Sequence, residues 1–298
     1  MTDNRCETFT LGHSPDPDDA FMFYAMAEDK IDLRGYRFEH RLEDIQTLNE
    51  RALRGELHIS AISIHAYAYV ASKYALLPCG ASMGDGYGPI VIRKRLTPHA
   101  ERSTSSADLL VDSAARHFLA DKKIAVPGTM TSAFLALRLF LGDFDYIVVA
   151  FDQIFDSVRT GRADVGLIIH EGQLTYAQSG FQKIVDLGRW WKGETGLPLP
   201  LGGNVVRKDI PSKVCRDLAE IIRESIDYGL AHREEAVRHS LSYARDMNAT
   251  LAGEFIGMYV NEFTRDYGQL GRAAIRRFLT EACDRGYVEV PIEVEFVE

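Results

Sequence analysis

The stretch GLIIHEGQLTYA, residues 166–177, contains the pattern on which this chain of 298 residues is built. The run GLII is short and apolar, as in a buried β-strand. It stops at His170 and Glu171, and a polar segment with helical character follows. A strand that ends in an ionisable pair either closes in a surface turn or presents a proton acceptor at the edge of a sheet. The residues alone leave both alternatives open.

An earlier segment repeats this order of features. RGELHISAISIHAYAYVA (residues 54–71) and TGRADVGLIIHEGQLTYA (residues 160–177) both run from a helix end through a glycine and a buried strand to a polar strand end and a helix. Few residues are identical in the two segments, so what is repeated is the order of structural elements and not the sequence itself. It predicts that Ser63 and His170 occupy comparable positions in two similar units.

Strand-like and helix-like segments alternate over much of the chain. The expected strands are residues 7–11, 36–42, 123–128, 146–151 and 163–169. The expected helices are one that Asp18 or Asp19 caps, residues 44–53 with a stop at Gly55, residues 131–141, residues 154–160 and most of residues 211–286. This alternation favours parallel sheets covered by helices, and therefore an α/β fold with a helical C-terminal segment.

Two groups of alternating elements predict two α/β lobes with a ligand cleft between them. We expect a large, discontinuous lobe from residues 1–92 and 204–298, and a small lobe from residues 93–203. Residues 95–121, with the polar run RSTSSAD, are expected to form an excursion and a helix that link the lobes. Residues 189–209 contain several Gly and Pro residues and are expected to return as an extended crossover.

Composition excludes several classes of protein. The net charge of -9 argues against a surface for nucleic acid or anionic membrane. The four cysteines are far apart and show no CxxC spacing, which fits a reducing compartment better than a disulfide framework or a zinc site. No basic segment followed by an apolar run opens the chain, and no apolar run reaches the ~18 residues of a membrane span. We therefore expect a soluble, cytoplasmic protein.

Polar side chains follow four expected strands, where open α/β sheets bind their ligands. These strand ends are GHSPDPDD (residues 12–19), AISIH (61–65), PGTMTSAF (127–134) and IIHEG (168–172). His170 is a candidate base because histidine titrates near neutral pH. The alternative is a histidine that caps the next helix or bonds a backbone carbonyl. Glu171 either orients the imidazole or, since neighbouring side chains on a strand point to opposite faces, caps the helix or forms an ion pair.

The other strand ends admit a functional and a structural interpretation. Thr131 and Ser132 place hydroxyls and free amides at a helix start, which suits a carboxylate or a sugar hydroxyl, or simply an N-cap. Ser63 follows the same argument with less specificity. Three carboxylates in GHSPDPDD crowd a helix start, where capping or a hard metal ion would explain them, although no EF-hand pattern is present. The glycines of SMGDGYGP lack the spacing of a dinucleotide-binding motif.

Four motifs together resemble one known family. SPDPDDAFMFYA, PGTMTSAF, GLIIHEGQLTY and IVDLGRWWKGETGLPLPLGG occur in this order and span nearly the whole chain. They resemble the menaquinone-biosynthesis family of 1,4-dihydroxy-6-naphthoate synthase, most specifically in the block from IIHE to PLPLG. The sister chorismate dehydratases share the scaffold but are less similar in that block.

The resemblance implies a fold like that of type II periplasmic binding proteins, with two α/β lobes, two crossovers and a cleft. It also implies a cytoplasmic lyase of the futalosine pathway. Such an enzyme converts cyclic dehypoxanthinyl futalosine to 1,4-dihydroxy-6-naphthoate without a metal or organic cofactor. Its catalytic base falls on His170. Its substrate-binding positions fall on Ser63, Thr131 and Ser132, with Ser14 and Ala61 beside them.

Two departures from the family pattern bear on the substrate. The first motif usually reads closer to SPCPNDTF, and many members carry a lysine where this chain has Ala61. Losing a cation beside an anionic substrate weakens binding by ~0.2–1 kcal/mol for an exposed pair, and by more when the pair is desolvated. The expected partner is still a small anion with a carboxylate and sugar-derived hydroxyls. A homodimer is left open, since Trp190 and Trp191 could form an interface as well as a cleft wall.

Three alternatives from other classes remain. A non-catalytic binding protein for small carboxylates fits the fold and the missing lysine, but such a receptor would need an export signal. A ligand-sensing regulator would be accompanied by a DNA-binding module or a basic stripe, and neither is visible. An enzyme like chorismate dehydratase, or another lyase acting on a sugar or carboxylate, could use the same scaffold.

Overall fold

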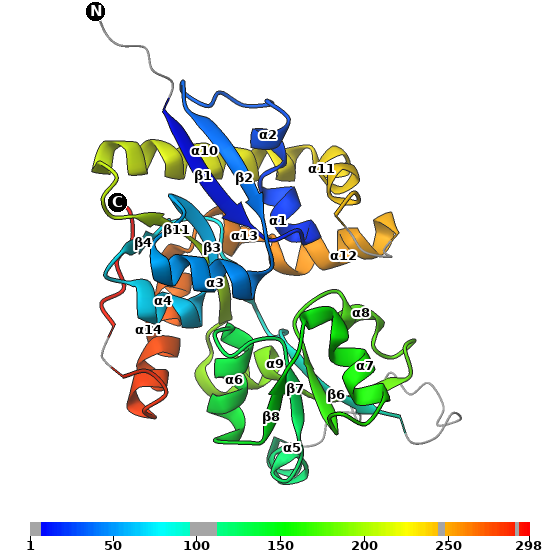
Figure 1. The fold of residues 1–298 in the computed structure, drawn as a ribbon. Coiled ribbons are helices and arrows are strands. Elements are labelled where there is room, and N and C mark those ends of the chain that lie inside the picture. Colours follow the sequence, from blue (N-terminus) through cyan, green and yellow to red (C-terminus); the bar gives the residue numbers. More distant parts are fainter. Residues whose placement is uncertain (1–6, 96–111, 244–247, 290–291) are drawn as a thin grey trace, which may run out of the picture. The chain divides into compact units, whose positions relative to one another are not determined.

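The computed structural model describes residues 7–95, 112–243, 248–289 and 292–298. The chain forms two compact units, coloured along the sequence in Figure 1. The first unit comprises Met1–Met83, Pro200–Leu279 and Val290–Glu298, and the second comprises Gly84–Leu199 and Thr280–Glu289. The boundary placed from the sequence at residues 92/93 falls inside strand β6 (Ile90–Lys94), whose neighbours β9 and β10 both belong to the second unit.

A short C-terminal segment also joins the second unit, although the sequence analysis assigned all of residues 204–298 to the large lobe. The Arg285 guanidinium donates to the carbonyl oxygen of Leu139 at 2.9 Å. The Tyr287 hydroxyl donates to the carbonyl oxygen of Arg138 at 3.2 Å, and the Arg138 guanidinium lies 3.9 Å from the Tyr287 ring centre. These contacts hold residues 280–289 on helix α6 (Ser132–Leu141) of the second unit.

The first unit is built on a six-stranded sheet with the order β2-β1-β3-β11-β4, and β5 pairs with β11. Its strands are β1 (Thr8–His13), β2 (Arg37–Leu42), β3 (Ile59–Ser63), β4 (Tyr74–Leu76), β5 (Ser82–Gly84) and β11 (Leu199–Arg207). Strand β1 runs parallel to β2 and β3, but β11 runs antiparallel to β3 and β4. The expectation of a purely parallel sheet was therefore wrong, because the returning strand β11 enters the middle of the sheet.

Neighbouring residues of β1 show how helices cover both faces of this sheet. Leu11 packs in a core with Phe21 and Ile222, which come from helices of the first unit. Gly12 faces the other way, where a Cβ atom would lie 2.5 Å from a methyl group of Leu57 and 2.8 Å from one of Leu48. A side chain at Gly12 would displace α3 (Ile45–Arg54), so glycine allows this helix to pack close to the sheet.

The helices of the first unit follow the expected order, with a helical C-terminal segment. They are α1 (Pro17–Met22), α2 (Tyr24–Ala27), α3, α4 (Ile64–Val70), α10 (Ser212–Ala231), α11 (Arg233–Ser240), α12 (Ala249–Tyr259), α13 (Glu262–Arg265) and most of α14 (Gly268–Asp284). Helix α3 lies within one residue of the predicted range 44–53. The Asp44 carboxylate caps it by accepting from two backbone amides, and Gly55 ends it at φ 71°, as predicted for Gly55. No helix in the described residues is both long and apolar enough to span a bilayer.

The second unit contains a five-stranded sheet with the order β10-β6-β9-β7-β8. Its remaining strands are β7 (Ile124–Val126), β8 (Tyr146–Val148), β9 (Val165–Ile168) and β10 (Phe181–Asp186). Strand β7 is parallel to β8 and β9, whereas β6 is antiparallel to β9 and β10. Its core contains mostly aliphatic residues, namely Ile90, Ile92, Ala125, Ile154, Val158, Ala163, Ile168 and Phe181.

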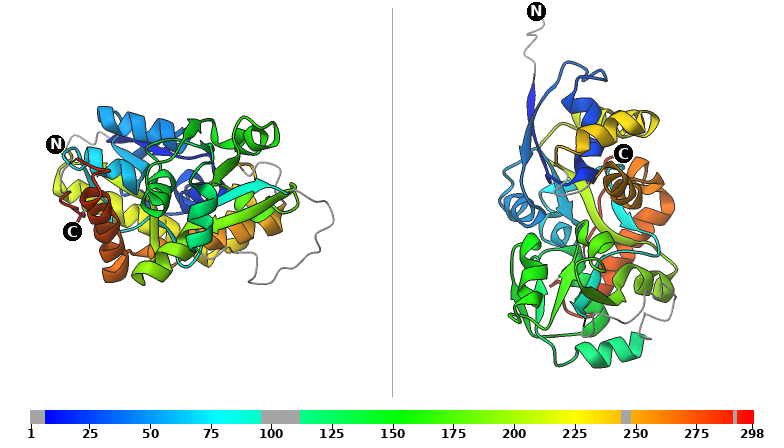
Figure 2. Two further views of the ribbon diagram at one scale, coloured as in Figure 1. Left: turned by 90° about the horizontal axis from the view of Figure 1, so that it is seen from below. Right: turned by 90° about the vertical axis from the view of Figure 1, so that its right-hand side faces the viewer.

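The connections in this sheet place helices on both faces. The chain moves outward from β7 to β8 through α6 and back from β8 to β9 through α7 (Ile154–Arg159). Because parallel crossovers are right-handed, α6 and α7 lie on opposite faces of the sheet (Figure 1); Figure 2 gives two further views of the ribbon. The other helices are α5 (Asp112–Leu119), the 3-10 turn η2 (Phe151–Gln153), α8 (Gly172–Thr175) and α9 (Leu187–Thr195).

Two expected connections differ from the structure. Residues 189–209 are not extended throughout, because Asp186 caps α9 and Gly196 ends it at φ 72°, so that only β11 is extended. Helix α5 packs on α6 and β10 within the second unit, so it does not link the units. The preceding polar run, residues 96–111, lies outside the described residues.

Candidate functional site

His170 lies in a polar loop just beyond β9 and is 9% exposed. Its Nε2 atom lies 3.1 Å from the carbonyl oxygen of Phe151, and its Nδ1 atom accepts the backbone N–H of Gly172 at 3.0 Å. The rings of Phe151 and Phe155 meet the imidazole edge to face, with centroids 5.7 and 6.0 Å away. The side chain is therefore fixed by backbone groups and enclosed by aromatic rings.

These two contacts select the tautomer of the neutral ring. A carbonyl oxygen only accepts and an amide N–H only donates, so Nε2 carries the hydrogen and Nδ1 carries the lone pair. This tautomer has the lone pair that a general base requires. Each ring nitrogen has a backbone partner, as in the structural alternative considered from the sequence, but the lone pair on Nδ1 is still able to take a proton.

Glu171 lies beside His170, contrary to the expectation from strand geometry. Its backbone is helical (φ -53°, ψ -16°) because it is the N-cap of α8, and its Oε2 atom lies 3.6 Å from Nδ1 of His170. The carboxylate makes no capping hydrogen bond, so the predicted helix-capping role was wrong. The predicted ion pair fits the geometry, with His170 as the partner, but it forms only when the imidazole is protonated.

The hydroxyl of Thr131 holds the start of α6. It donates to the carbonyl oxygen of Gly128 at 2.9 Å and accepts the backbone N–H of Phe134 at 3.1 Å. This is an N-cap, the structural alternative for PGTMTSAF. Ser132 is the first residue of the helix and is buried. The ten-residue helix α6 therefore starts at the carboxyl end of β7, with its first amides directed out of the helix.

In the first unit, Ser63 ends β3 and is bound by a residue that the sequence analysis missed. The amide side chain of Asn49 donates to Oγ of Ser63 at 3.0 Å and accepts the backbone N–H of Ser63 at 2.8 Å. Among the described residues, no acceptor lies within hydrogen-bonding distance of the proton on the Ser63 hydroxyl. The available sequence signal was weak: Asn49 directly follows Leu48 in the predicted helix, and only the structure shows that both are fully buried.

Ser14 is bound on three sides. Its N–H donates to the Asp19 carboxylate at 2.7 Å, its hydroxyl donates to the Asp16 carboxylate at 3.0 Å, and its carbonyl oxygen lies 3.1 Å from Nδ1 of His13. The expectation that Asp18 or Asp19 caps α1 was wrong. Asp16 occupies the N-cap position because Pro17 starts the helix, and the Asp19 carboxylate turns back to Ser14.

The carboxylates of this loop and the nearby histidines have unusual acidities. Burial lowers the pKa of His13 to about 4, and burial together with the charge of His13 lowers the pKa of His40 to about 4. The two rings share a hydrogen bond of 3.0 Å between Nε2 of His13 and Nδ1 of His40. Burial raises the pKa of Asp19 to about 6, and burial plus the charges of Asp19 and Asp16 raise that of Asp18. Burial thus favours the neutral form of both histidines at neutral pH and makes Asp18 and Asp19 weaker acids than usual.

Ala61 lies in β3 two residues before Ser63 and is 7% exposed. It packs with Leu48 and Leu57, and Ile45 lies against the same cluster. The position is apolar and offers no group that could bind a carboxylate. Among the described residues, no group of three or more His, Cys, Asp or Glu side chains is arranged to hold a metal ion, including the acidic loop around Asp16.

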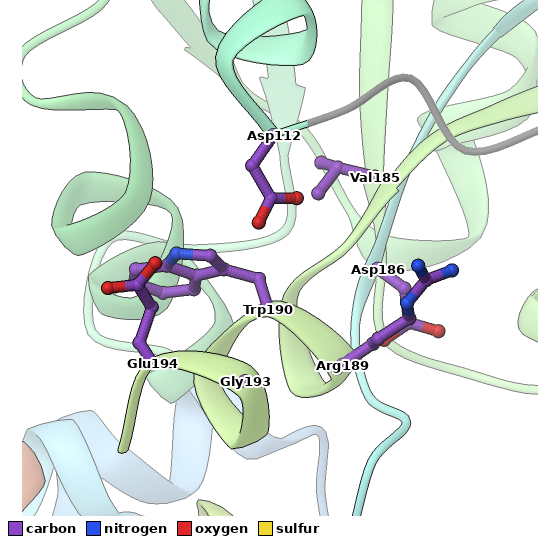
Figure 3. Close-up of a pocket in the computed structure, with 7 residues that line it drawn as sticks. All are labelled: Asp112, Val185, Asp186, Arg189, Trp190, Gly193 and Glu194. Atoms are coloured by element: carbon purple, nitrogen blue, oxygen red, sulfur yellow. The ribbon is translucent and has the colours of Figure 1, made fainter. Parts of the chain in front are cut away.

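A separate cavity of about 210 Å³ lies in the second unit and is shown in Figure 3. Its lining comes from α5, β10 and α9 and consists of Asp112, Val185, Asp186, Arg189, Trp190, Gly193 and Glu194. None of the strand-end candidates lines it. Asp186 caps α9 through the amides of Gly188 and Arg189, and its burial raises its pKa. Trp190 and Trp191 are both buried within this unit, where Trp190 packs on Phe140.

Comparison with known proteins shows which family this chain belongs to. Residues 9–284 match the sequence pattern of the family described as menaquinone biosynthesis. The chain belongs to this family. A 1,4-dihydroxy-6-naphthoate synthase of Thermus thermophilus is 36% identical over 280 residues, which cover 94% of this chain and 96% of that protein. Membership of the menaquinone-biosynthesis family confirms the resemblance inferred from the four motifs.

Solved structures place the family member in its fold class. Protein AF1704 of Archaeoglobus fulgidus is 37% identical, with a TM-score of 0.85 over 97% of this chain and all of that chain. The CA3427 gene product of Candida albicans, described as having the generic periplasmic binding protein fold, is 13% identical with a TM-score of 0.69 over 98% of this chain and 97% of its own. The predicted periplasmic-binding-protein-like α/β fold is thereby confirmed.

Proposed function

We propose that this chain is a 1,4-dihydroxy-6-naphthoate synthase, a lyase-type enzyme of menaquinone biosynthesis, with His170 as its general base. The family match over residues 9–284 and the synthase of T. thermophilus support the activity. The expected substrate, on the resemblance of the motifs, is cyclic dehypoxanthinyl futalosine. The observation that supports the base is the neutral His170 ring, held by two backbone contacts with its lone pair on Nδ1.

The chemistry assigned to His170 is proton transfer. The neutral imidazole removes a proton from a carbon or hydroxyl of the cyclised sugar portion of the substrate. Ring opening and elimination of the sugar-derived part follow, and formation of the aromatic naphthalene ring drives them. A positioned base contributes ~10²–10⁴-fold to such a step, and fixed orientation contributes much of the rest. The proposed reaction therefore needs no metal or organic cofactor.

Ser63 is proposed to donate a hydrogen bond to the substrate. Asn49 donates to its oxygen, so the serine oxygen already has a donor and its own proton is left for a ligand acceptor. Thr131 differs, because its hydroxyl proton is used on the Gly128 carbonyl. In the second unit we therefore assign substrate binding to Ser132 and the first amides of α6, with Thr131 acting through its cap.

Ser14 and Ala61 complete the proposed set of substrate-binding positions. Ser14 is fully engaged with Asp16, Asp19 and His13, so its role would be to fix the start of α1 rather than to donate through its hydroxyl. Ala61 would contribute an apolar surface. The proposed polar contacts for a carboxylate and hydroxyls are then Ser63 in the first unit, and Ser132 with the first amides of α6 in the second. A cytoplasmic location and a homodimer are further parts of the proposal, to be checked by fractionation and by light scattering.

The test is turnover of cyclic dehypoxanthinyl futalosine by the purified protein, with mass detection of 1,4-dihydroxy-6-naphthoate and His170→Ala in parallel. Product from the wild type and at least a hundredfold less from the variant is expected. Wild-type product with an unaffected variant would remove His170 from the mechanism. A saturable rise in melting temperature without product would favour the rival proposal of a non-catalytic carboxylate-binding protein. Turnover of chorismate instead would favour the dehydratase activity on the same scaffold.

A further inference from the structure

The starting observation is the direction of the lone pair in His170. Nδ1 accepts from the Gly172 amide at 3.0 Å, and Nε2–H points to the Phe151 carbonyl at 3.1 Å. A proton that reaches this ring can bind only at Nδ1, since Nε2 already carries one. Once Nδ1 is protonated, it faces an amide that is also a donor, so the Gly172 hydrogen bond is lost.

The Glu171 carboxylate lies close to that proton. Its Oε2 atom lies 3.6 Å from Nδ1, too far for a hydrogen bond to the neutral ring. A charge-assisted N–H···O bond to a carboxylate is about 2.7–2.9 Å long, so a movement of less than ~1 Å would form one. The described residues give His170 no other ion-pair partner. Both side chains are mostly buried, at 10% and 17% exposed, so water screens the pair only in part.

The absence of a side chain at Gly172 allows the His170 ring to lie close to the Gly172 amide and to Glu171. A Cβ atom at Gly172 would lie 2.7 Å from Cε1 of His170 and 2.9 Å from two ring atoms of Phe155. Such contacts are too short, so any larger residue would push the imidazole away from the amide and from Glu171. The glycine lets the ring rest on the start of α8, with the Glu171 carboxylate beside its lone pair.

We propose that Glu171 is the positioning residue of His170: it directs the substrate proton to Nδ1 and accepts the hydrogen bond that the new N–H donates. This inference rests on the proposed function of His170 as a base. In the step, the proton leaves the substrate and its electron pair stays there. The lone pair of Nδ1 forms the N–H bond, the Gly172 amide loses its acceptor, and the imidazolium pairs with the carboxylate. The reverse transfer restores the neutral ring.

The test follows the ring nitrogens of His170 directly, by long-range ¹H–¹⁵N correlation of protein labelled on histidine. The signals are assigned with His170→Gln and followed across pH in wild type and Glu171→Gln. We expect the Nε2–H tautomer in the neutral wild-type ring. In Glu171→Gln the ionisation midpoint should lie below that of the wild type, since an opposite charge beside the ring favours the charged form. An Nδ1–H tautomer, or a midpoint that does not move, would overturn the inference.

Kinetics supply a second measurement that a merely structural role would not reproduce. In Glu171→Gln, the acid limb of the pH profile of kcat/KM should move to lower pH, and kcat on the plateau should fall about tenfold. Glu171→Asp should recover part of both effects. A lower rate with an unmoved acid limb would mean that Glu171 only shapes the loop. If the wild type forms no naphthoate product, the proposed function fails, while the nitrogen signals still decide whether Glu171 controls His170.

The chain offers a matched control for the glutamate substitution. His239 and Glu28 in the first unit form the same kind of pair, with Nδ1 and Oε1 3.3 Å apart. Glu28→Gln should leave the signals of His170 and the pH profile of turnover unchanged. A change at His170 in this variant would show that loss of any surface carboxylate moves its titration, and would remove the specific role of Glu171.

Discussion

Each unit has a histidine at the end of a strand, and the two differ in their partners. In the first unit, His13 contacts the Ser14 carbonyl and the ring of His40. In the second unit, Nδ1 of His170 accepts from the Gly172 amide and lies near the Glu171 carboxylate. For the hydroxyls at the strand ends, it is the first unit that has the group available to a ligand. Ser63 in the first unit keeps a proton to donate, and Thr131 in the second has used its proton on a backbone carbonyl. Residue type therefore does not decide which side chain is available for chemistry; the partners of each polar atom do.

The largest effect is expected when the two histidines are exchanged for glutamine. His170→Gln should lower kcat by ~10²–10⁴-fold, because it removes the only lone pair of the proposed base. His13→Gln should lower stability and change kcat by far less, since His13 is assigned no proton transfer. Turnover and thermal unfolding of both variants measure this contrast. Equal losses of kcat would show that His13 belongs to the reaction.

Ser63→Ala is expected to have the next largest effect. A hydrogen bond to a charged group contributes about 1.5–3 kcal/mol, so loss of the serine proton should reduce kcat/KM by ~10–100-fold. Asn49→Ala is the companion variant, because it leaves the Ser63 hydroxyl in place and removes the side chain that orients it. It should lower both stability and kcat/KM. Unchanged kinetics in Ser63→Ala would assign this serine to the fold alone.

The buried histidine pair predicts a loss of stability in acid. His13 has a pKa of about 4 when folded and about 6.5 when unfolded, so between these values the unfolded state binds more protons and stability falls as the pH falls. One such group costs about 2 kcal/mol at pH 5. Asp19, with a pKa of about 6 when folded, acts in the opposite direction, because the folded state takes up its proton first.

Denaturant unfolding at pH 7 and pH 5 separates these contributions. The wild type should lose a moderate amount of stability on acidification. Asp19→Asn keeps an oxygen for the Ser14 amide but removes the opposing proton uptake, so its loss should be larger by about 1 kcal/mol. His13→Gln should lose less than the wild type. A steeper loss in His13→Gln would mean that His13 gains, rather than avoids, a proton in the folded state.

Sequence patterns predicted the helices and strands better than they predicted which groups the polar side chains would hydrogen-bond. The periodicity of α3 and its Gly55 stop are local properties, and the structure has them as predicted; the Asp44 cap was not predicted. The antiparallel strand β11 was missed because pairing with β3 depends on residues ~140 positions away. A bond from His170 to a backbone carbonyl was one alternative from the sequence, but its partners, the Phe151 carbonyl and the Gly172 amide, were not predicted because both are backbone groups.

The smallest effect is expected at Thr131, where sequence left a ligand cradle and an N-cap equally open. Thr131→Val keeps the shape of the side chain but loses the bonds to the Gly128 carbonyl and the Phe134 amide. Losing such a cap costs about 1 kcal/mol, so unfolding should occur a few degrees lower while kcat/KM changes by less than about twofold. Thr131→Ser, which retains the hydroxyl, should behave as the wild type in both measurements. A large loss of kcat/KM at unchanged stability would instead give this hydroxyl to the substrate, and the contrast between the two strand-end hydroxyls would disappear.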